Sequence, residues 1–348
     1  MMSRANALSA IAVLVFVLPA SAKPTIVTFD APNAGTAAFT GTQVFGMSKN
    51  GEVAGTAYGN DFSVHGFVRH PDGSFLTFPS GASYYQPYGV NVHGNVTGIF
   101  QDGSTTEGFV AKAGGKAKVF QASKDALYTA PNWIGDGGDV AGYVGTAGSI
   151  NHGFVRNKKG HVEIFDAPGA SLTANGGTNA VFVDEHGTVA GSFFDTNLVS
   201  HGYLRAPDGT FTVITDSSAG TGSRQGTKIL TVNTSGVAAG YYVDAQDATH
   251  GLIWNAGQFT HFDVKGLVNT HVRTINAKGD VTGWAADANG ATHGFVRSSK
   301  GKITVFDAPG SGTASGQGTL SEGIADDGSV SGFFIDSANV YHGFIRTP

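Results

Sequence analysis

The hydrophobic pattern begins with an uninterrupted apolar run at the N-terminus. Residues 7–18 are almost wholly apolar, follow Arg4, and precede the small residues Ala20, Ser21 and Ala22. A run of this length is too short to span a bilayer, and its basic start and small-residue end are typical of a secretory signal peptide. We therefore expect residues 1–22 to be removed and the exported chain to begin at Lys23.

After this run, short apolar stretches of strand length alternate with glycine-rich polar stretches in a repeating unit. A pentapeptide of the form HGFVR recurs at intervals of 42 to 49 residues. A Gly-x-x-x-Gly element precedes each copy, and the sequence FDAP ends the clearest units. The seven copies of the pentapeptide begin at His65, Glu107, His152, His201, His250, His293 and His342.

Each unit predicts four short strands separated by turn residues, and a period of about 46 residues is typical of one propeller blade. The sequence therefore predicts an all-β fold in which residues 23–348 form a single seven-bladed β-propeller. An apolar residue four positions before the first glycine of each unit marks the innermost strand. These residues are Met47, Val90, Ile134, Val183, Val232, Ile275 and Ile324.

The two ends of the chain predict how the array is closed. The seventh unit stops after HGFIRTP and has no fourth strand, whereas residues 25–32 form a fourth strand without a unit of its own. We expect the two ends to pair, so that the N-terminal strand completes the last blade and covers its exposed edge.

Composition narrows the class of protein further. The 348 residues include 52 Gly and no Cys, 41% are hydrophobic, and the formal net charge is −5. These values exclude a disordered chain and a disulfide-stapled mini-protein, and the lack of a basic run disfavours nucleic acid as a partner. We expect a secreted or periplasmic bacterial protein that is a monomer and has no membrane span after signal cleavage.

The repeat resembles the HAF-type bacterial extracellular repeat. The resemblance rests on Gly-x-Val-x-Gly followed by His-small-Phe, as in Gly279 to Gly283 with His293, Gly294 and Phe295. It covers residues 25–348, although this sequence has Gly where that motif usually has Ala. The resemblance implies export and a propeller-like fold, and it implies no defined chemistry.

The repeated polar residues predict structural roles. Equivalent histidines in a propeller lie too far apart to share a zinc ion, so we expect each to lock one blade. We expect the guanidinium of each pentapeptide arginine to reach a carboxylate or a carbonyl, and first of all an FDAP aspartate such as Asp166 or Asp307. Aspartates four positions after the second glycine predict turns. A calcium site at Asp244 and Asp247 is the alternative at one of these turns, and no other cofactor is expected.

Departures from the repeat point to a binding site at the mouth of the channel. One side is aromatic, with Tyr84, Tyr85, Tyr88, Tyr128 and Trp133, and another is cationic, with Arg224, Lys228, His271 and Arg273. Aromatic rings stack on sugars, and basic groups bind carboxylates. The residues six positions before the first glycine belong to this region: Phe45, Tyr88, Asn132, Val181, Leu230, Arg273 and Glu322.

Two functions fit this pattern. The first is a non-catalytic exported module that binds an extracellular or envelope polysaccharide, or a protein, at the channel mouth. The second is a polysaccharide lyase acting on a uronic-acid polymer. In that enzyme Arg273 would neutralise the carboxylate, while Tyr88 and His271 would serve as base and acid. Binding is favoured because the sequence contains no paired acids, catalytic triad or metal-ligand cluster.

Overall fold

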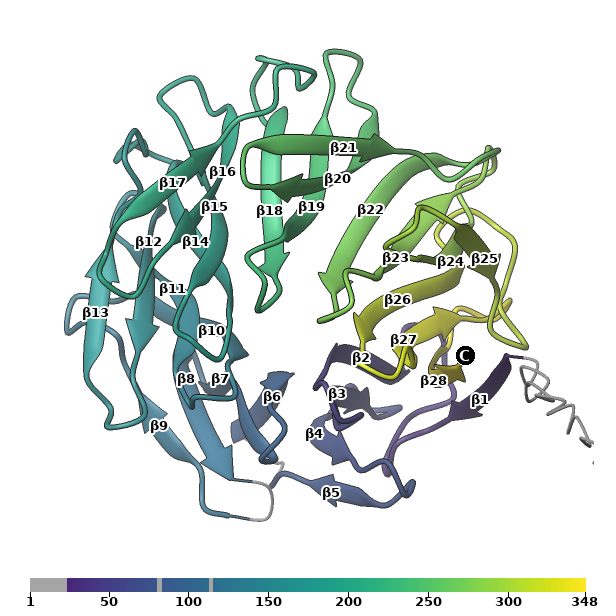
Figure 1. Ribbon diagram of the computed structural model, residues 1–348. Helices are drawn as coiled ribbons and strands as arrows, with labels where there is room; N and C mark the ends of the chain where they lie inside the picture. The colour runs from purple at the N-terminus through teal and green to yellow at the C-terminus, as the bar shows by residue number, and fades with distance from the viewer. Residues whose placement is uncertain (1–23, 80–82, 113–114) are drawn as a thin grey trace, which may run out of the picture.

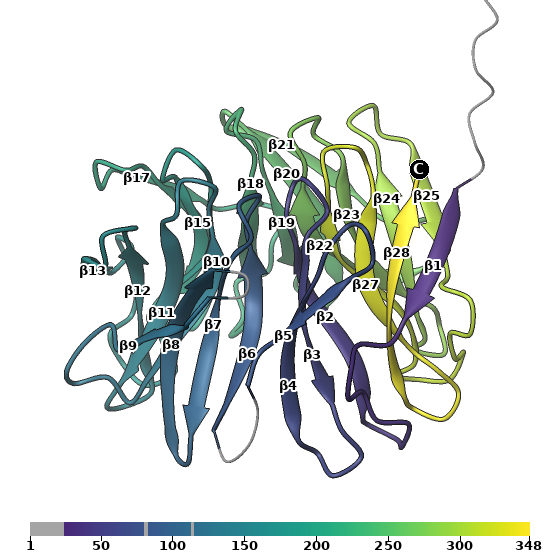
Figure 2. The ribbon, with the colours of Figure 1, turned by 90° about the horizontal axis from the view of Figure 1, so that it is seen from below.

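The computed structural model describes residues 24–79, 83–112 and 115–348, which form 28 β-strands and no helix. The expected all-β class is confirmed. In Figure 1 the strands form successive sheets around a central gap in chain order, and Figure 2 shows the same array from the side. No helix that could cross a membrane occurs among these residues. The expected signal peptide, residues 1–22, lies outside the described residues.

Consecutive strands pair antiparallel in groups of four, so the 28 strands fit about seven units. The innermost strand of each unit is β2 (Gly41–Met47), β6 (Ser83–Val90), β10 (Tyr128–Ile134), β14 (Gly177–Val183), β18 (Gly226–Val232), β22 (Val268–Ile275) or β26 (Gly318–Ile324). The second strand is β3 (Val53–Tyr58), β7 (Asn95–Asp102), β11 (Val140–Thr146), β15 (Val189–Phe194), β19 (Ala238–Val243), β23 (Val281–Ala286) or β27 (Val330–Ile335).

The third strand of each unit carries the HGFVR pentapeptide, and the outermost strand leads to FDAP or its variants. The third strands are β4 (Val64–Arg69), β8 (Thr105–Lys112), β12 (Ile150–Arg156), β16 (Ser200–Arg205), β20 (Thr249–Asn255), β24 (Thr292–Arg297) and β28 (Tyr341–Thr347). The outermost strands are β5 (Phe75–Thr77), β9 (Lys118–Phe120), β13 (Val162–Phe165), β17 (Phe211–Ile214), β21 (Gln258–Phe262), β25 (Ile303–Phe306) and β1 (Thr25–Phe29).

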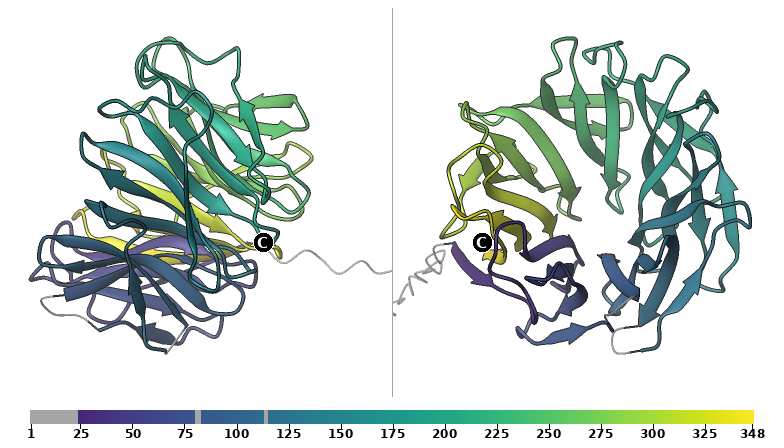
Figure 3. Two further views of the ribbon diagram at one scale, coloured as in Figure 1. Left: turned by 90° about the vertical axis from the view of Figure 1, so that its left-hand side faces the viewer. Right: turned by 180° about the vertical axis from the view of Figure 1, so that it is seen from behind.

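The N-terminal strand β1 pairs antiparallel with β28, with Thr25 opposite Thr347 and Phe29 opposite Gly343. The expected pairing of the two chain ends is therefore confirmed. Figure 1 shows β1 beside β28 and the C-terminus, and the right view of Figure 3 shows the same purple strand from behind. Among the described residues, backbone hydrogen bonds do not run around the whole array. The described strands form one sheet of 12 and one of 16, because no ladder in this part of the chain joins β4 to β6 or β20 to β22.

Every innermost strand contains a β-bulge at the same place. The pairing with the second strand shifts by one residue, for example between Val44 and Gly46 and between Pro131 and Trp133. A bulge leaves one residue outside the ladder and turns its side chain in a new direction. The bulged residues are Phe45, Tyr88, Asn132, Val181, Leu230, Arg273 and Glu322.

Each of the three repeated glycines is required for a different structural reason. The first glycine of each Gly-x-x-x-Gly element lies in the turn after the innermost strand and has a positive φ, as at Gly138 (91°). The second presses against the bulged strand, so that a Cβ at Gly142 would lie 2.7 Å from Pro131 Cα. The pentapeptide glycine faces the FDAP phenylalanine, and a Cβ at Gly153 would lie 2.7 Å from Phe165 Cε2.

Apolar packing takes place between neighbouring units. The buried side chains of the described residues form seven clusters. Together with the partly buried side chains packed against it, each cluster combines residues of two adjacent units. The apolar residue four positions before the first glycine is buried in every unit, as the sequence predicted. Burial of this kind is the main stabilising contribution in a fold whose sheets contact one another face to face.

The pentapeptide histidines have structural roles, as expected. In three units the histidine Nδ1 atom lies about 3 Å from the carboxylate of an aspartate in the same unit, which is hydrogen-bond distance. The pairs are His152 with Asp166, His250 with Asp263, and His293 with Asp307. Asp195, Asp244, Asp287 and Asp336 accept backbone N–H bonds in the turns before these strands, which agrees with the prediction of turn aspartates. Calcium is not needed to account for those bonds.

The aspartate partners predicted for the arginines are wrong, whereas the carbonyl alternative is found, for example where Arg69 Nη1 donates to the His70 carbonyl at 3.2 Å. The FDAP aspartates bind the histidines, and each arginine lies over a phenylalanine ring of the preceding unit. Arg156 Cζ is 4.8 Å from the centre of the Phe120 ring, and Arg69 Cζ is 4.9 Å from that of Phe29. These cation–π contacts link adjacent units. Five arginines make such contacts: Arg69, Arg156, Arg205, Arg297 and Arg346.

Candidate ligand-binding channel

All seven bulged residues line one central cavity of about 490 Å³. Three of them are partly exposed between two buried neighbours, whereas one is exposed and one is buried: these are Phe45, Tyr88 and Leu230, then Arg273, then Glu322. The bulge brings this column to the cavity, because it turns one side chain per unit out of the packed interface and toward the axis. The column that the sequence analysis assigned to the channel region is therefore brought together in the structure.

Aromatic rings form one side of the cavity. Phe45 and Tyr88 meet edge to face with their ring centres 5.3 Å apart, and Tyr143 lies on the same wall. Trp133 and Phe182 stack at 5.0 Å. Burial raises the pKa of Tyr88, so its hydroxyl stays protonated and available as a hydrogen-bond donor.

Three asparagines add polar groups to the aromatic wall. Asn132 Nδ2 donates to the carbonyl of Ala180 at 2.8 Å, and Asn151 Nδ2 donates to Asn179 Oδ1 at 2.8 Å. The Tyr128 hydroxyl donates to Asn151 Oδ1 at 2.6 Å and fixes that side chain. Asn132 Oδ1 and Asn179 Nδ2 make no further hydrogen bond to the described residues, so both can serve a ligand in the cavity.

An ion pair occupies the opposite wall. Arg273 Nε and Nη2 each lie 2.7 Å from Glu322 Oε2. Glu322 is 7% exposed, whereas Arg273 is 42% exposed because its guanidinium faces the cavity. The charge of Glu322 raises the pKa of Arg273, and burial raises the pKa of Glu322 against the opposing effect of the arginine. The wall is polar, yet its two charges balance each other.

Two of the other predicted cationic residues, His271 and Lys228, make aromatic contacts outside the cavity lining. His271 stacks on Trp284 at 4.0 Å and meets Tyr241 edge-on at 4.8 Å. Burial, with the charges of Arg273 and Lys228, lowers the pKa of His271 to about 4, so the ring is neutral near pH 7. Lys228 Nζ lies 5.5 Å from the centre of the Tyr241 ring.

The remaining predicted residues are dispersed. Tyr85 packs in an apolar cluster with Phe78 and Phe109, 5.1 Å from the latter ring. Arg224 is exposed in the loop before β18, with φ of 68°. Tyr84 is partly exposed near the start of β6 and is not part of the cavity lining. Of the predicted site residues, the cavity is lined by Tyr88, Trp133 and Arg273.

Sequence reasoning missed five lining residues, namely Tyr143, Asn151, Asn179, Phe182 and Thr274. Two of them carried a readable signal. Asn179 stands two positions before the bulged Val181, where strand alternation places a side chain on the same face. Tyr143 directly follows the second glycine of its unit, beside the bulged strand. Comparing these two columns between units would have found both.

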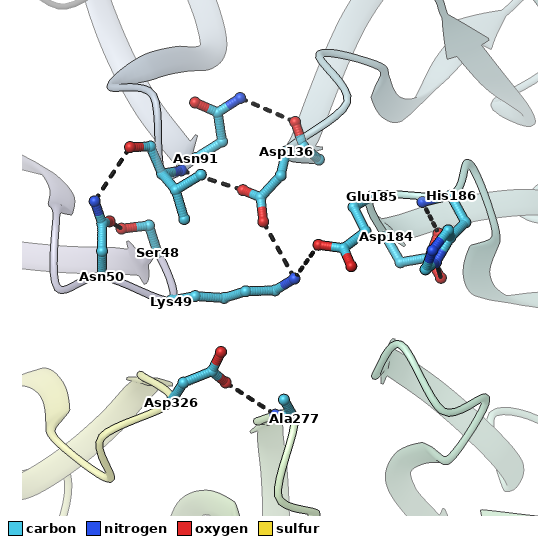
Figure 4. A network of polar contacts seen from close by, with 12 residues as sticks. Ser48, Lys49, Asn50, Asn91, Asp136, Asp184, Glu185, His186, Ala277 and Asp326 are labelled. Carbon is cyan, nitrogen blue, oxygen red and sulfur yellow. Dashed lines mark hydrogen bonds and ion pairs between the residues drawn. The ribbon is translucent and has the colours of Figure 1, made fainter.

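A charged network lies at the other end of the channel, beyond the ends of the innermost strands. Lys49 Nζ is 3.1 Å from Asp136 Oδ2 and 2.6 Å from Glu185 Oε2. Figure 4 shows the lysine reaching from the turn after β2 to these two acids. Asp326 extends the network because its amide donates to the Lys49 carbonyl at 3.2 Å.

Comparison with solved structures defines the class as β-propeller-like. The chain is similar to streptogramin B lyase, with 13% identity, a TM-score of 0.56, and coverage of 93% of this chain and 98% of that one. For the β-propeller domain of the Trilobed protease from Pyrococcus furiosus the values are 11%, 0.54, 91% and 95%. For the BP39L lectin from Burkholderia pseudomallei they are 12%, 0.52, 86% and 94%. These likenesses concern the fold alone. No family model matches the chain, and no curated protein matches it by sequence.

Proposed function

We propose that the protein is an exported, seven-bladed propeller that binds an extracellular or envelope glycan in its central cavity. The lining of that cavity carries the proposal. Seven clusters between adjacent units support the blade count, and the pairing of β1 with β28 supports closure by the N-terminal strand. The proposed signal peptide accounts for export, and we expect the exported form to be a monomer.

The chemistry of the lining fits a neutral sugar. A sugar ring has apolar C–H faces and a rim of hydroxyls that both donate and accept hydrogen bonds. Tyr88 and Tyr143 offer aromatic surface, while Asn132 Oδ1 and Asn179 Nδ2 offer one acceptor and one donor. A volume of about 490 Å³ is in the range of small-molecule sites, which are mostly apolar with a few placed polar groups.

The same geometry favours binding over a lyase reaction. Tyr88 and Arg273 do share the cavity, as the lyase hypothesis required. However, two nitrogens of the Arg273 guanidinium contact the Glu322 carboxylate. The positive charge of Arg273 is therefore already balanced by Glu322 before a uronate carboxylate could bind to it. His271 stacks on Trp284, meets Tyr241 edge-on and is not part of the lining. The arrangement therefore supplies a recognition surface rather than a carboxylate neutraliser with a base.

A glycan array followed by calorimetric titration tests the proposal. We expect retention of neutral oligosaccharides, with binding at least tenfold weaker in Asn132→Ala and Tyr88→Ala. Asn289→Ala and Phe62→Ala are matched controls in exposed turns and should bind as the wild type does. Growth of the ultraviolet absorbance of unsaturated uronates during incubation with pectin or alginate would instead support a lyase. Absence of any glycan binding would overturn the proposal.

A further inference from the structure

The central cavity is almost closed at one end. It shares Trp133, Phe182 and Thr274 with a second cavity of only about 50 Å³. This smaller cavity is lined by the apolar ends of the innermost strands, such as Val90 and Val232, and by the turns that follow them. The channel therefore narrows sharply at the stacked rings of Trp133 and Phe182.

The narrowing is built into the repeat by size complementarity. The residue directly after the bulge is large in two units, Trp133 and Phe182, and is glycine in three others, Gly46, Gly89 and Gly323. A Cβ at Gly46 would lie 2.8 Å from Trp133 Cζ3, and a Cβ at Gly89 would lie 2.9 Å from Trp133 Cα. The indole thus extends from β10 past β6 to β2, into space that only glycine leaves open.

The charged network around Lys49 also covers this end of the channel. Lys49 links β2 to the turns after β10 and β14 through Asp136 and Glu185. Asp136 Oδ1 accepts the Val92 amide at 3.1 Å, and Asp326 Oδ1 accepts the Ala277 amide at 3.0 Å. Figure 4 shows these contacts joining turns of several units at the narrow end of the channel. These cross-links hold the turns of several units together at the narrow end of the channel.

From these observations we infer that the cavity is a blind chamber that recognises the end of a glycan chain, not its interior. This inference rests on the proposed glycan-binding function and deepens it. A polymer cannot thread through the floor formed by Trp133 and Phe182. A ligand enters past Asn151 and Asn179, at the start of β12 and in β14, and only its terminal sugars reach Tyr88 and Asn132.

Linear and cyclic glucans of matched composition provide the test. We propose titrating the full exported chain with linear malto- and laminari-oligosaccharides of increasing length, and with cyclodextrins and cyclic β-glucans, which have no ends. We expect linear chains to bind with one protein per chain at every length, and cyclic counterparts to bind at least tenfold more weakly. Several proteins per long chain, or equal affinity for cyclic glucans, would overturn end recognition and leave glycan binding intact. A lack of binding to every linear and cyclic glucan would count against both proposals.

Two variants separate the floor from the outer network. Phe182→Ala removes one of the two stacked rings. We expect it to reduce the ratio between the affinities for linear and cyclic glucans. Lys49→Met removes the ion pairs at the narrow end of the channel but leaves the floor of Trp133 and Phe182 intact. This variant should still bind with one protein per glycan chain. If Lys49→Met binds several copies along a long chain, the floor is not what excludes chain interiors. The measurements on the wild type decide the matter if Phe182→Ala does not fold.

Discussion

His342 Nδ1 lies 2.8 Å from Asp30 Oδ1, which joins two residues 312 positions apart in the chain. Asp30 directly follows β1, and His342 lies in β28. Within other units the same contact is made by a histidine and an aspartate only 13 or 14 positions apart, such as His152 and Asp166. The contact between the chain ends is thus the repeat's own contact, formed by strand exchange.

Phe29 provides the first prediction, because its ring fills the closing interface. It packs 5.8 Å from the Phe75 ring and beneath Arg69. We expect Phe29→Ala to lower the free energy of unfolding by about 3 kcal/mol. Asp30→Asn, which alters the exposed contact between Asp30 and His342, should cost less than about 1 kcal/mol. Urea unfolding followed by fluorescence measures both.

Phe62→Ala is the matched control for Phe29→Ala, because Phe62 is 66% exposed. Its unfolding free energy should stay within about 0.5 kcal/mol of the wild type. Equal stability of Phe29→Ala and Phe62→Ala would mean that β1 does not close the array.

The arginine contacts provide a second prediction. Arg156 lies over Phe120 of the preceding unit, and burial lowers the pKa of this arginine without an acidic partner to offset it. Lysine keeps the charge but loses the planar guanidinium, so Arg156→Lys should lower the unfolding free energy by about 1 kcal/mol. Exposed Lys158→Arg is the control and should have no effect. An unchanged Arg156→Lys variant would show that the stacking contributes nothing to stability.

The pH dependence of stability gives a third prediction. Burial lowers the pKa of His250, but hydrogen bonds to Asp263 and Asp244 raise it above its ordinary value overall. The contribution of His250 to the free energy of unfolding is therefore fully present below about pH 6.5 and is lost as the pH rises through the folded-state pKa of His250. The Ala248 amide and His250 hold the pKa of Asp244 below its ordinary value. The contribution of Asp244 is therefore lost as the pH falls through the folded-state pKa of Asp244.

The stability difference between wild type and His250→Gln should consequently be largest between about pH 4 and pH 6.5. It should shrink toward pH 9. Chemical unfolding over this range measures the difference, with His93→Gln in an exposed turn as the control. A difference that is constant from pH 5 to pH 9, or that grows with pH, would contradict the assigned contacts.

Glu322 provides a fourth prediction, on specificity. Its carboxylate balances Arg273 in the cavity wall. Glu322→Gln should leave the guanidinium unpaired and facing the cavity, so affinity for uronic-acid oligosaccharides should rise at least tenfold relative to neutral ones. Calorimetric titration with a matched pair, such as glucuronic acid and glucose oligomers, measures the change. An unchanged ratio would show that the ion pair does not set the charge preference.

The positions of the channel residues could be predicted from the sequence, because a strict repeat places equivalent residues at equivalent places in space. Phe45 and Arg273 belong to the same column, and both line the cavity. The aspartate partners predicted for the arginines are wrong because the strand register keeps the two residues apart. Gly153 lies opposite Phe165, which sets His152 beside Asp166 and places Arg156 opposite Val162. Four residues along a strand separate the arginine from the aspartate by about 13 Å.

Other parts of the site could not be predicted from one unit at a time. The contribution of Asn151 depends on a hydrogen bond to Asn179 in the next unit. The closed end of the channel depends on the Trp133 indole reaching Gly46, two units away. Pairing of Arg273 with Glu322 likewise crosses between units. Such contacts follow from the three-dimensional packing of units, which the repeat pattern does not encode.

Fluorescence of Trp133 tests the central claim, that the cavity lined by the bulged residues is the binding site. The chain has 3 Trp, so Trp254→Phe with Trp284→Phe leaves Trp133 as the single reporter in the cavity. The account predicts that a bound neutral oligosaccharide shifts the Trp133 emission and protects it from acrylamide quenching, with the same affinity as in calorimetry. Glycan binding that leaves the emission and quenching of Trp133 unchanged would place the site elsewhere and contradict the account.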